Sequence, residues 1–342
     1  MWRYLHASVC TVCLFFLLLP LTLADSAKPL QIYFIDVEGG QSTLIVDPAN
    51  ESLLVDTGWP GFNGRDADRI MASAKAAGIT HIDYLVITHY HGDHVGGVPQ
   101  LASRIKIGTV VDHGPDQENS DATRTGYSNY RKALGQSKHL VAKPGDRLPF
   151  KGMSVQFVAA AGEAITSPLP GAGKPNPFCA SEPEAPVDPT ENAQSVGMLI
   201  TYQQFRFIDL GDLTKRKERN LVCPNNLIGT VDLYLTTHHG LDLSNSKAMV
   251  DALHPRVAIM NNGAHKGGIP AAWQIIHDSP GLEDLWQLHY AVVGGKDHNV
   301  SDDRIANLGE NDQGNYVKVS AETDGTFTVI NTRNKYSKKY KK

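Results

Sequence analysis

Residues 88–97 read Thr-His-Tyr-His-Gly-Asp-His-Val-Gly-Gly and follow directly on a short apolar run. Within six consecutive positions they place three histidines and one aspartate, namely His89, His91, Asp93 and His94. Imidazole nitrogens and carboxylate oxygens are the donors that hold zinc and its neighbours in the first transition row. The glycines of the stretch allow the backbone to turn sharply enough to aim these donors at one point. The sequence therefore predicts a metal site where a strand ends.

The same pattern, an apolar run followed by residue types that bind metals, returns further along the chain. The apolar runs are predicted strands. The side chains that follow them are Asp56, Asp212, the pair His238 and His239, and His265. In layered α/β proteins, the loops at the carboxyl ends of strands gather at one edge of the sheet. We therefore expect these side chains to converge on the histidine-rich stretch.

Residues 89–94 (HYHGDH) resemble the HxHxDH signature of the metallo-β-lactamase fold superfamily of metallohydrolases. The partners of that signature follow in the family's order. Asp56 matches its upstream aspartate and Asp212 its bridging carboxylate, and either His238 or His239 matches its last histidine. The resemblance covers essentially the whole chain after the N-terminal segment. It implies an α/β chain folded as a four-layer αββα sandwich, with two mixed β-sheets packed face to face and the site at one edge.

The resemblance also implies two sets of metal ligands. They share the bridging carboxylate and are His89, His91 and Asp212 for a first metal, and Asp93, His94, Asp212 and His238 for a second. Most members of the superfamily with two zinc ions have a third histidine ligand where this chain has Asn192, and asparagine offers only a neutral carbonyl. We therefore expect the second site to fill first, with one or two zinc ions in total, or manganese in place of zinc.

Several of these residues have more than one interpretation. Neighbouring side chains of a strand point to opposite faces, so only one of His238 and His239 is expected to reach a metal. The match to the family signature favours His238 as the metal ligand and places His239 near the substrate. Asp56 is predicted to orient the histidine loop from behind, although a turn aspartate would also explain it. We assign Asp93 to positioning the attacking water, and His265 either to substrate binding and proton donation or to the surface.

A bound metal ion lowers the pKa of its water to around 7, so hydroxide is the predicted nucleophile of a metal-dependent hydrolase. A narrower resemblance concerns the bond that is cut. Residues 34–42 (FIDVEGGQS) are similar to the opening of the hydrolase domain of ComEC-type competence proteins, and residues 192–196 resemble their NxxS element. This implies phosphodiesterase activity on a small-molecule or nucleic-acid substrate. The alternatives are an exported lactonase or β-lactamase-type acyl hydrolase, and a noncatalytic metal-binding module.

The first 24 residues are typical of a secretory signal peptide. Arg3 and His6 precede an apolar run over residues 9–19, and small residues follow it. The run is too short for a comfortable membrane span, so we expect no stable membrane insertion after cleavage and a secreted or periplasmic protein. The remaining chain is predicted to be one hydrolase domain over residues 25–332. No feature of the sequence indicates its oligomeric state.

Three segments lie outside this pattern. Residues 166–191 contain seven prolines and form either a lid over a cleft or a surface insertion. Residues 333–342 are predicted to be a basic, flexible tail. Basic residues over 215–219 either contact phosphates or form a solvated helix face. The formal net charge of the whole chain, −4 at pH 7, does not indicate a polyanion partner.

The cysteines bear on the redox environment. Two of the four fall inside the predicted signal peptide, so Cys179 and Cys223 are the cysteines expected in the exported chain. An oxidising compartment favours a disulfide between them, and the alternative is a pair of free thiols.

Overall fold

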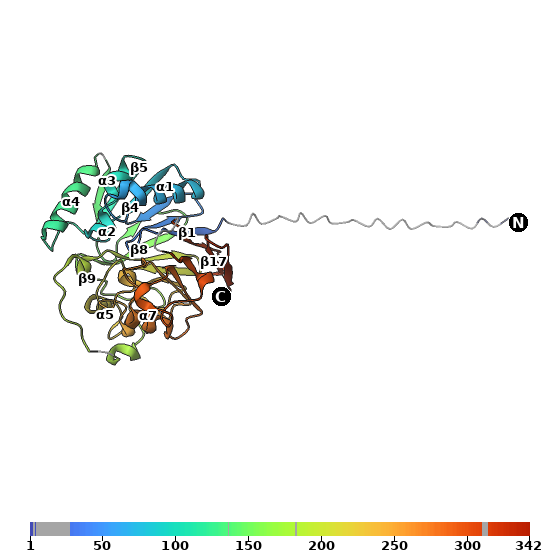
Figure 1. The fold of residues 1–342 in the computed structure, drawn as a ribbon. Helices are drawn as coiled ribbons and strands as arrows, with labels where there is room; N and C mark the ends of the chain where they lie inside the picture. Colours follow the sequence, from blue (N-terminus) through green and yellow to red (C-terminus); the bar gives the residue numbers. More distant parts are fainter. Residues whose placement is uncertain (3, 5–27, 136, 182, 310–313) are drawn as a thin grey trace.

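Two nine-stranded β-sheets pack face to face in the computed structural model, and helices cover both outer faces (Figure 1). The structure describes residues 1, 2, 4, 28–135, 137–181, 183–309 and 314–342. The predicted signal peptide lies almost entirely outside the described residues. The layers are those of an αββα sandwich, so the predicted fold class is confirmed.

The first sheet combines an antiparallel half with a parallel half. Its strands, in order across the sheet, are β18 (Ser337–Tyr340), β17 (Phe327–Asn331), β16 (Val317–Ala321), β1 (Leu30–Phe34), β2 (Thr43–Val46), β3 (Ser52–Val55), β4 (His81–Val86), β5 (Lys106–Asp112) and β6 (Lys138–Val141). The helices on its outer face are α1 (Arg65–Ala77), α2 (Gly92–Val95), α3 (Val98–Ala102) and α4 (Asp121–Ala133) (Figure 1). Strands β3 to β6 are parallel, so their carboxyl ends share one edge.

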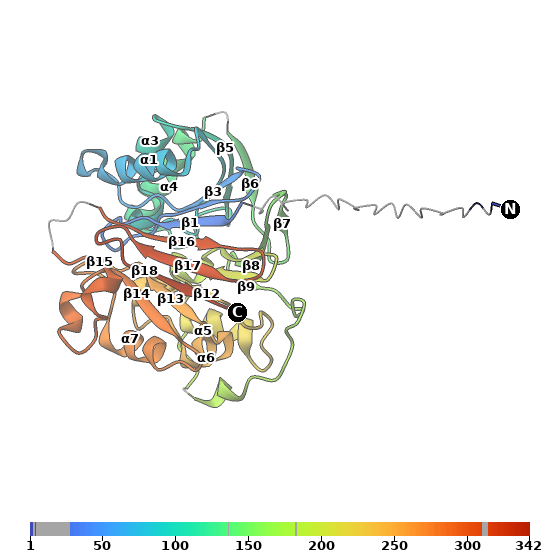
Figure 2. The same ribbon diagram turned by 90° about the vertical axis from the view of Figure 1, so that its right-hand side faces the viewer.

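The second sheet is parallel over five of its strands, from β11 to β15. Its order is β15 (Ile305–Asn307), β14 (Asp284–His289), β13 (Val257–Met260), β12 (Leu233–Leu235), β11 (Phe205–Asp209), β10 (Gly197–Tyr202), β8 (Ser154–Ala160) and β7 (Arg147–Leu148), with β9 (Glu163–Ala164) paired to β8. Its helices are α5 (Lys215–Val222), α6 (Lys247–Leu253) and α7 (Pro270–His277) (Figure 2). Short 3₁₀ turns are η1 (Phe62–Gly64), η2 (Pro177–Ala180), η3 (Glu191–Gln194), η4 (Thr237–Gly240), η5 (Val292–Gly294) and η6 (Asp302–Arg304).

The core lies between the two sheets. Along β1, Ile32 and Phe34 point into this layer, whereas Tyr33 points outward into a second apolar cluster beneath the helices. The rings of Phe34 and Phe207, from opposite sheets, meet edge to face with centroids 5.6 Å apart. Both faces of the central strands are buried, which explains why their sequences are apolar throughout and do not alternate.

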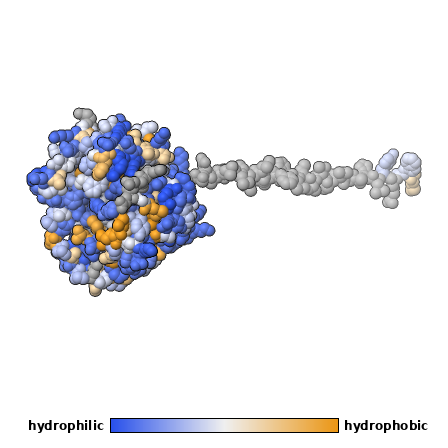
Figure 3. Space-filling model, in the orientation of Figure 1, coloured by the Kyte–Doolittle hydropathy of each residue, from blue (hydrophilic) through white to orange (hydrophobic). Residues whose placement is uncertain are grey.

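The surface in Figure 3 is mainly hydrophilic, with a hydrophobic area in its lower half. Among the residues described, no helix has both the length and the apolar character needed to cross a membrane.

The proline-rich segment over residues 166–191 is fastened to α5. A disulfide joins Cys179 to Cys223, so the two cysteines are paired in the structure. Arg219 donates to the carbonyl oxygen of Cys179 at 2.8 Å, and Arg216 donates to that of Ala185 at 3.2 Å. These contacts favour a surface insertion over a lid. They also engage Arg216 and Arg219, two of the basic residues of α5, which argues against α5 as a phosphate-binding helix.

The prediction of a flexible tail over residues 333–342 is wrong. Residues 337–340 form β18, which pairs antiparallel with β17. Tyr340 is buried, where its hydroxyl accepts from Trp286 Nε1 at 3.0 Å and donates to Asp284 Oδ2 at 2.7 Å. Lys338 Nζ forms an ion pair with Asp284. The lysines suggested a solvated chain, but one of them pairs with a carboxylate and the neighbouring tyrosine fills the core.

Replacing Tyr340 by alanine is therefore expected to lower the free energy of unfolding by about 3 kcal/mol, the lower end for removing a large aromatic side chain from a core. Urea unfolding of the purified variant measures this. Lys341→Ala, at an exposed neighbouring position, serves as control and should unfold like the wild type. Equal unfolding midpoints for Tyr340→Ala and wild type would show that this segment does not contribute to the fold.

Candidate metal centre

The histidine loop after β4 is held between two other strand-end loops. Its residue Asp93 offers its carbonyl oxygen to the amide of Gln41 at 3.1 Å, and Thr57 donates its amide to the carbonyl of His94 at 2.8 Å. A Cβ added at Gly40 would lie 2.4 Å from the Asp93 carbonyl oxygen, and one at Gly97 would lie 2.1 Å from that of Thr57. Only glycine permits these approaches. The glycines therefore fix the backbone from which the metal-binding side chains project.

Four buried side chains from three loops meet at the end of this loop: Asp93, His94, Asp212 and His239. His94 Nε2 lies 3.2 Å from Asp93 Oδ2, from Asp212 Oδ2 and from His239 Nε2. His239 Nε2 lies 3.1 Å from Asp93 Oδ2 and 3.4 Å from Asp212 Oδ2. These atoms mark out a compact polyhedron of two nitrogens and two oxygens.

The donor set fits a divalent ion of the first transition row. Bonds of about 2.0–2.1 Å in a tetrahedral site give ligand-to-ligand edges of roughly 3.3 Å, which is close to the distances above. Asp212 Oδ1 is buried and has no hydrogen-bond partner among the described residues, so it keeps an acceptor for an ion or a water. Asp93, His94, Asp212 and His239 are thus suited to hold the metal.

Asp56 supports this group from behind. Its Oδ2 lies 2.7 Å from Nδ1 of His94, and its Oδ1 accepts the Thr88 amide at 2.8 Å. A proton held on Nδ1 by a carboxylate leaves the Nε2 lone pair free to face a metal. The position of Asp56 is therefore the one expected from the sequence for a residue that orients the histidine loop.

The charges of the group favour bound cations. Burial by itself would raise the pKa values of Asp93 and Asp212, but the neighbouring histidines lower both pKa values well below their usual range. Both carboxyls are therefore ionised. In His94, burial is outweighed by the carboxylates of Asp212, Asp93 and Asp56, which raise the pKa well above its usual value. His94 therefore carries a proton that a bound ion would displace, because a neutral imidazole is the form that binds a metal. In the neighbouring His89, burial, followed by the proximity of His94, lowers the pKa well below its usual value.

The predicted first site keeps two of its ligand candidates together. His89 Nε2 lies 3.0 Å from His91 Nδ1 and 3.8 Å from Asp212 Oδ2, while the other ring nitrogen of His91, Nε2, is paired with Glu118 Oε2 at 2.9 Å. Asn192 is buried, and its Oδ1 has no partner among the described residues. Glu118 was missed by sequence reasoning, since nothing in its local sequence distinguishes it from a surface glutamate.

The residues around Asn192 border the cluster. The Ser195 hydroxyl accepts the Asp212 amide at 3.3 Å, and Val196 donates its amide to the carbonyl of Thr88 at 2.9 Å. Residues 192–195 therefore lie beside Asp212.

The choice between His238 and His239 is reversed by the structure. Both residues lie in η4 with left-handed backbone, at φ 56° and 57°, so the alternation of a strand does not apply to them. Both Nε2 atoms lie 3.4 Å from Asp212 Oδ2, but His239 alone of the two joins the group with Asp93 and His94. The other ring nitrogen of His238, Nδ1, lies 3.2 Å from the Ser244 hydroxyl. The interpretation of His239 as a substrate residue is therefore corrected to that of a ligand candidate.

Of the two neighbouring residues in the loop after β13, Lys266 contacts the cluster and His265 does not. The side chain of His265 is exposed, whereas Lys266 Nζ donates to Asp93 Oδ2 and lies 4.9 Å from the centroid of the Trp59 ring. Neither Lys266 nor Trp59 was identified from sequence. The sequence feature that could have indicated Lys266 is its position after a predicted strand and directly before a glycine pair.

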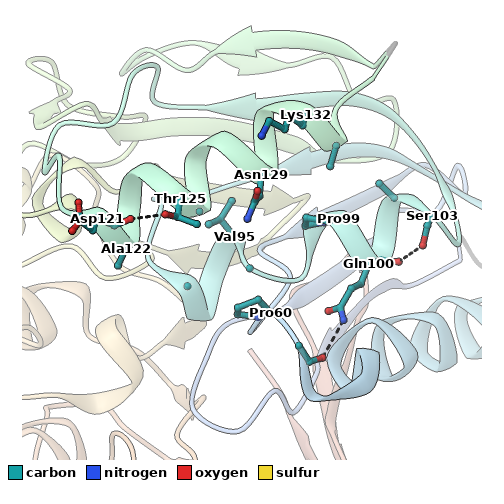
Figure 4. Close-up of a pocket in the computed structure, with 16 residues that line it drawn as sticks. Pro60, Val95, Pro99, Gln100, Ser103, Asp121, Ala122, Thr125, Asn129 and Lys132 are labelled. Atoms are coloured by element: carbon teal, nitrogen blue, oxygen red, sulfur yellow. Dashed lines mark hydrogen bonds between the residues drawn. The ribbon is translucent and has the colours of Figure 1, made fainter.

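A large groove borders the histidine loop from the outside, between α4 and the segment of α2 and α3 (Figure 4). Its volume is about 1110 Å³, and its lining includes Pro60, Val95, Pro99, Thr125 and Asn129. None of the four clustered side chains lines it. The groove is therefore separate from the candidate metal centre.

We expect His239→Ala to weaken zinc binding more than His238→Ala does, because only His239 contacts both carboxylates of the cluster. Loss of one of four ligands should exceed the 10- to 100-fold cost typical of residues that act behind a ligand. Competition with a chelating dye measures the affinity of each variant. A larger loss in His238→Ala would restore the assignment made from the strand pattern.

Comparisons with known proteins agree with this architecture. Residues 35–174 match the family model described as Metallo-beta-lactamase superfamily. A UPF0173 metal-dependent hydrolase of Agrobacterium fabrum is 35% identical over 124 residues, which is 36% of this chain and 42% of that protein. Hydroxyacylglutathione hydrolase of Stenotrophomonas maltophilia is 28% identical over 102 residues, or 30% and 37% of the two chains.

The chain thus spans less than half the length of these curated relatives. Among solved structures, the metallo-beta-lactamase fold protein YhfI of Bacillus subtilis aligns with a TM-score of 0.47 and 12% identity, over 76% of this chain and 96% of that one. The matched family model and the two packed mixed sheets together show that this chain has the metallo-β-lactamase fold.

Proposed function

We propose that this chain is an exported metal-dependent hydrolase that cleaves phosphodiester bonds. The observation that carries the hydrolase assignment is the meeting of Asp93, His94, Asp212 and His239 at ligand-to-ligand distances. The similarity to a protein named metal-dependent hydrolase supports it. The export part of the proposal rests on the composition of residues 1–24.

A divalent ion held by these four residues would supply Lewis-acid polarisation of the scissile bond and acidify water near neutral pH. The residues of the chain have complementary tasks. Asp56 retains the Nδ1 proton of His94 and so fixes the orientation of that ring. The ionised Asp93 carboxylate accepts a hydrogen bond from the attacking water and orients it toward the substrate.

Two segments support a phosphodiester as substrate. The segments similar to ComEC-type hydrolase domains both border the cluster, since the Gln41 amide binds the Asp93 carbonyl and the Ser195 hydroxyl binds the Asp212 amide. Arg216 and Arg219 of α5 are engaged with the proline-rich segment, which favours a small phosphodiester over a polymer bound along α5.

Acyl hydrolysis is the second candidate. It is favoured by the similarity to hydroxyacylglutathione hydrolase, and it includes the lactonase and β-lactamase-type reactions. The same cluster would serve either reaction, because both need a nucleophilic hydroxide and a polarised acceptor.

A substrate panel distinguishes these reactions. The purified protein, loaded with zinc or manganese, is assayed on bis-p-nitrophenyl phosphate, a hydroxyacyl thioester, a lactone and nitrocefin. His94→Ala removes a cluster residue, and His277→Ala, on the surface at the end of α7, is the matched control. Phosphodiester turnover that is lost in His94→Ala and kept in His277→Ala supports the proposal. Turnover of acyl substrates alone favours the second candidate, and metal binding without any turnover indicates a noncatalytic module.

A further inference from the structure

Lys266 reaches the metal centre from a loop whose backbone is fixed to the η4 turn. The amides of Gly268 and Ile269 donate to the carbonyl oxygens of His239 and Gly240, each at 3.0 Å. Within the loop, the Gly263 amide donates to the carbonyl of Lys266 at 2.8 Å. The position of Lys266 relative to His239 is therefore set by main-chain hydrogen bonds.

Glycines allow this loop to pack closely against its neighbours. A Cβ added at Gly267 would lie 2.1 Å from the carbonyl oxygen of His239, and one added at Gly39 would lie 2.9 Å from Cβ of Lys266. The loop is thus held between the Gly39–Gly40 segment and η4, with no room for side chains at these points. Such close packing leaves the Lys266 backbone little freedom to move away from the cluster.

The side chain of Lys266 is held on two sides and open on a third. Its Nζ donates to Asp93 Oδ2 and lies 4.9 Å from the centroid of the Trp59 ring. The side chain keeps 31% of its surface exposed. An ammonium group has three N–H donors, and one contact with Asp93 leaves others for a second acceptor.

We propose that Lys266 and Trp59 form an anion-binding subsite beside Asp93, which recognises a negatively charged oxygen group of the substrate. A divalent ion would balance the two carboxylates of Asp93 and Asp212, so the positive charge of Lys266 would remain for a ligand. The Trp59 ring holds the ammonium in place by a cation–π contact and shields one side from water. The ligand class is an anionic oxygen group, either a phosphate or a carboxylate.

This inference deepens the proposed function, because the subsite lies at the proposed reaction centre. Lys266→Met keeps the length of the side chain and removes its charge, while Lys266→Arg keeps the charge. Lys266→Gln is a second uncharged variant in case the first fails to fold. Lys296→Met, at an exposed lysine in another loop, is the matched control. Metal content and unfolding midpoint are compared for all variants first.

The first readout is binding, without turnover. Inorganic phosphate and acetate are titrated separately into the metal-loaded protein while tryptophan fluorescence is recorded, and Trp59→Phe identifies the contribution of Trp59. We expect the wild type to bind at least one of these anions, and the uncharged variants to bind it about 10- to 100-fold more weakly, the usual effect of losing a charge-assisted hydrogen bond. Lys266→Arg should restore part of the affinity, and Lys296→Met should match the wild type. The anion that responds indicates whether a phosphate or a carboxylate is recognised.

The second readout is kinetic, and separates the two proposals. Lys266→Met is expected to raise KM for the anionic substrate that is turned over more than it lowers kcat. Equal binding of both anions by wild type and the uncharged variants, or binding of neither by the wild type, would overturn the subsite and leave Lys266 as a partner of Asp93 only. Lys266-dependent anion binding in a protein that hydrolyses no substrate would uphold the subsite and refute the proposed function.

Discussion

Asp212→Ala is expected to abolish stable metal binding and to slow hydrolysis by more than about 100-fold, the upper end of the cost for residues that merely support a ligand. Asp212 Oδ2 lies within 3.2 to 3.8 Å of the Nε2 atoms of four histidines, which include His94 and His239. Its removal takes away the central negative charge of the cluster. Metal content after dialysis and initial rates on the substrate that the wild type turns over measure the two effects.

The control for this variant is Asp242→Ala. Asp242 is exposed in the loop directly after η4, so its loss should leave metal content and rate unchanged. Asp212→Asn adds a matched comparison, because it preserves the shape of the side chain and removes its charge. A metal content equal to wild type in both Asp212 variants would show that the ion is bound elsewhere.

The second large effect expected is a loss of thermal stability when the disulfide is removed. Cys179 and Cys223 are separated by 44 residues, and closing a loop of that length stabilises a folded chain by about 4 kcal/mol in the chain-entropy model. We therefore expect Cys179→Ala/Cys223→Ala to lower the thermal midpoint by on the order of 10 °C. Differential scanning calorimetry of the oxidised wild type and the double variant tests this.

Reduction of the wild type under native conditions provides an independent comparison, since it should lower the midpoint by a similar amount. Thiol titration of the unfolded, unreduced protein should find neither cysteine free. Identical midpoints for the oxidised wild type, the reduced wild type and the double variant would mean that the proline-rich segment is held by its other contacts, including that of Arg219 with the Cys179 carbonyl.

Much of the candidate site is visible in the sequence because its residues follow strands. Asp93 and His94 follow β4 and Asp212 follows β11, and each of these strands is parallel to a neighbour in its own sheet, so their carboxyl ends share an edge with those of their neighbours. The position of Asp56 behind His94 also agrees with the expectation that a ligand histidine has a carboxylate behind it. The convergence of strand ends follows from topology, whereas the assignment of Asp212 as a shared ligand is what the resemblance to the metallo-β-lactamase signature implies.

The residues that were assigned wrongly or missed depend on local backbone or on contacts distant in sequence. His239 is placed by the left-handed conformation of η4, which an apolar pattern does not encode. Lys266 approaches Asp93 across 173 positions of sequence, and Glu118 approaches His91 across 27. The tail was misassigned because the burial of Tyr340 depends on Trp286, in the other sheet. Amino-acid composition does not reveal which residues distant in sequence lie close together in the fold.

The pairing of β1 with β16 sets an order of events during folding. Leu30 lies opposite Ala321, so the first sheet joins segments almost three hundred residues apart. Until β16 is available, β1 presents an unpaired edge and the sheet that carries the histidine loop lacks three of its nine strands. Contacts of such long range form slowly, because the intervening chain must first be ordered. We therefore expect the sheet that carries the histidine loop to be completed late in folding.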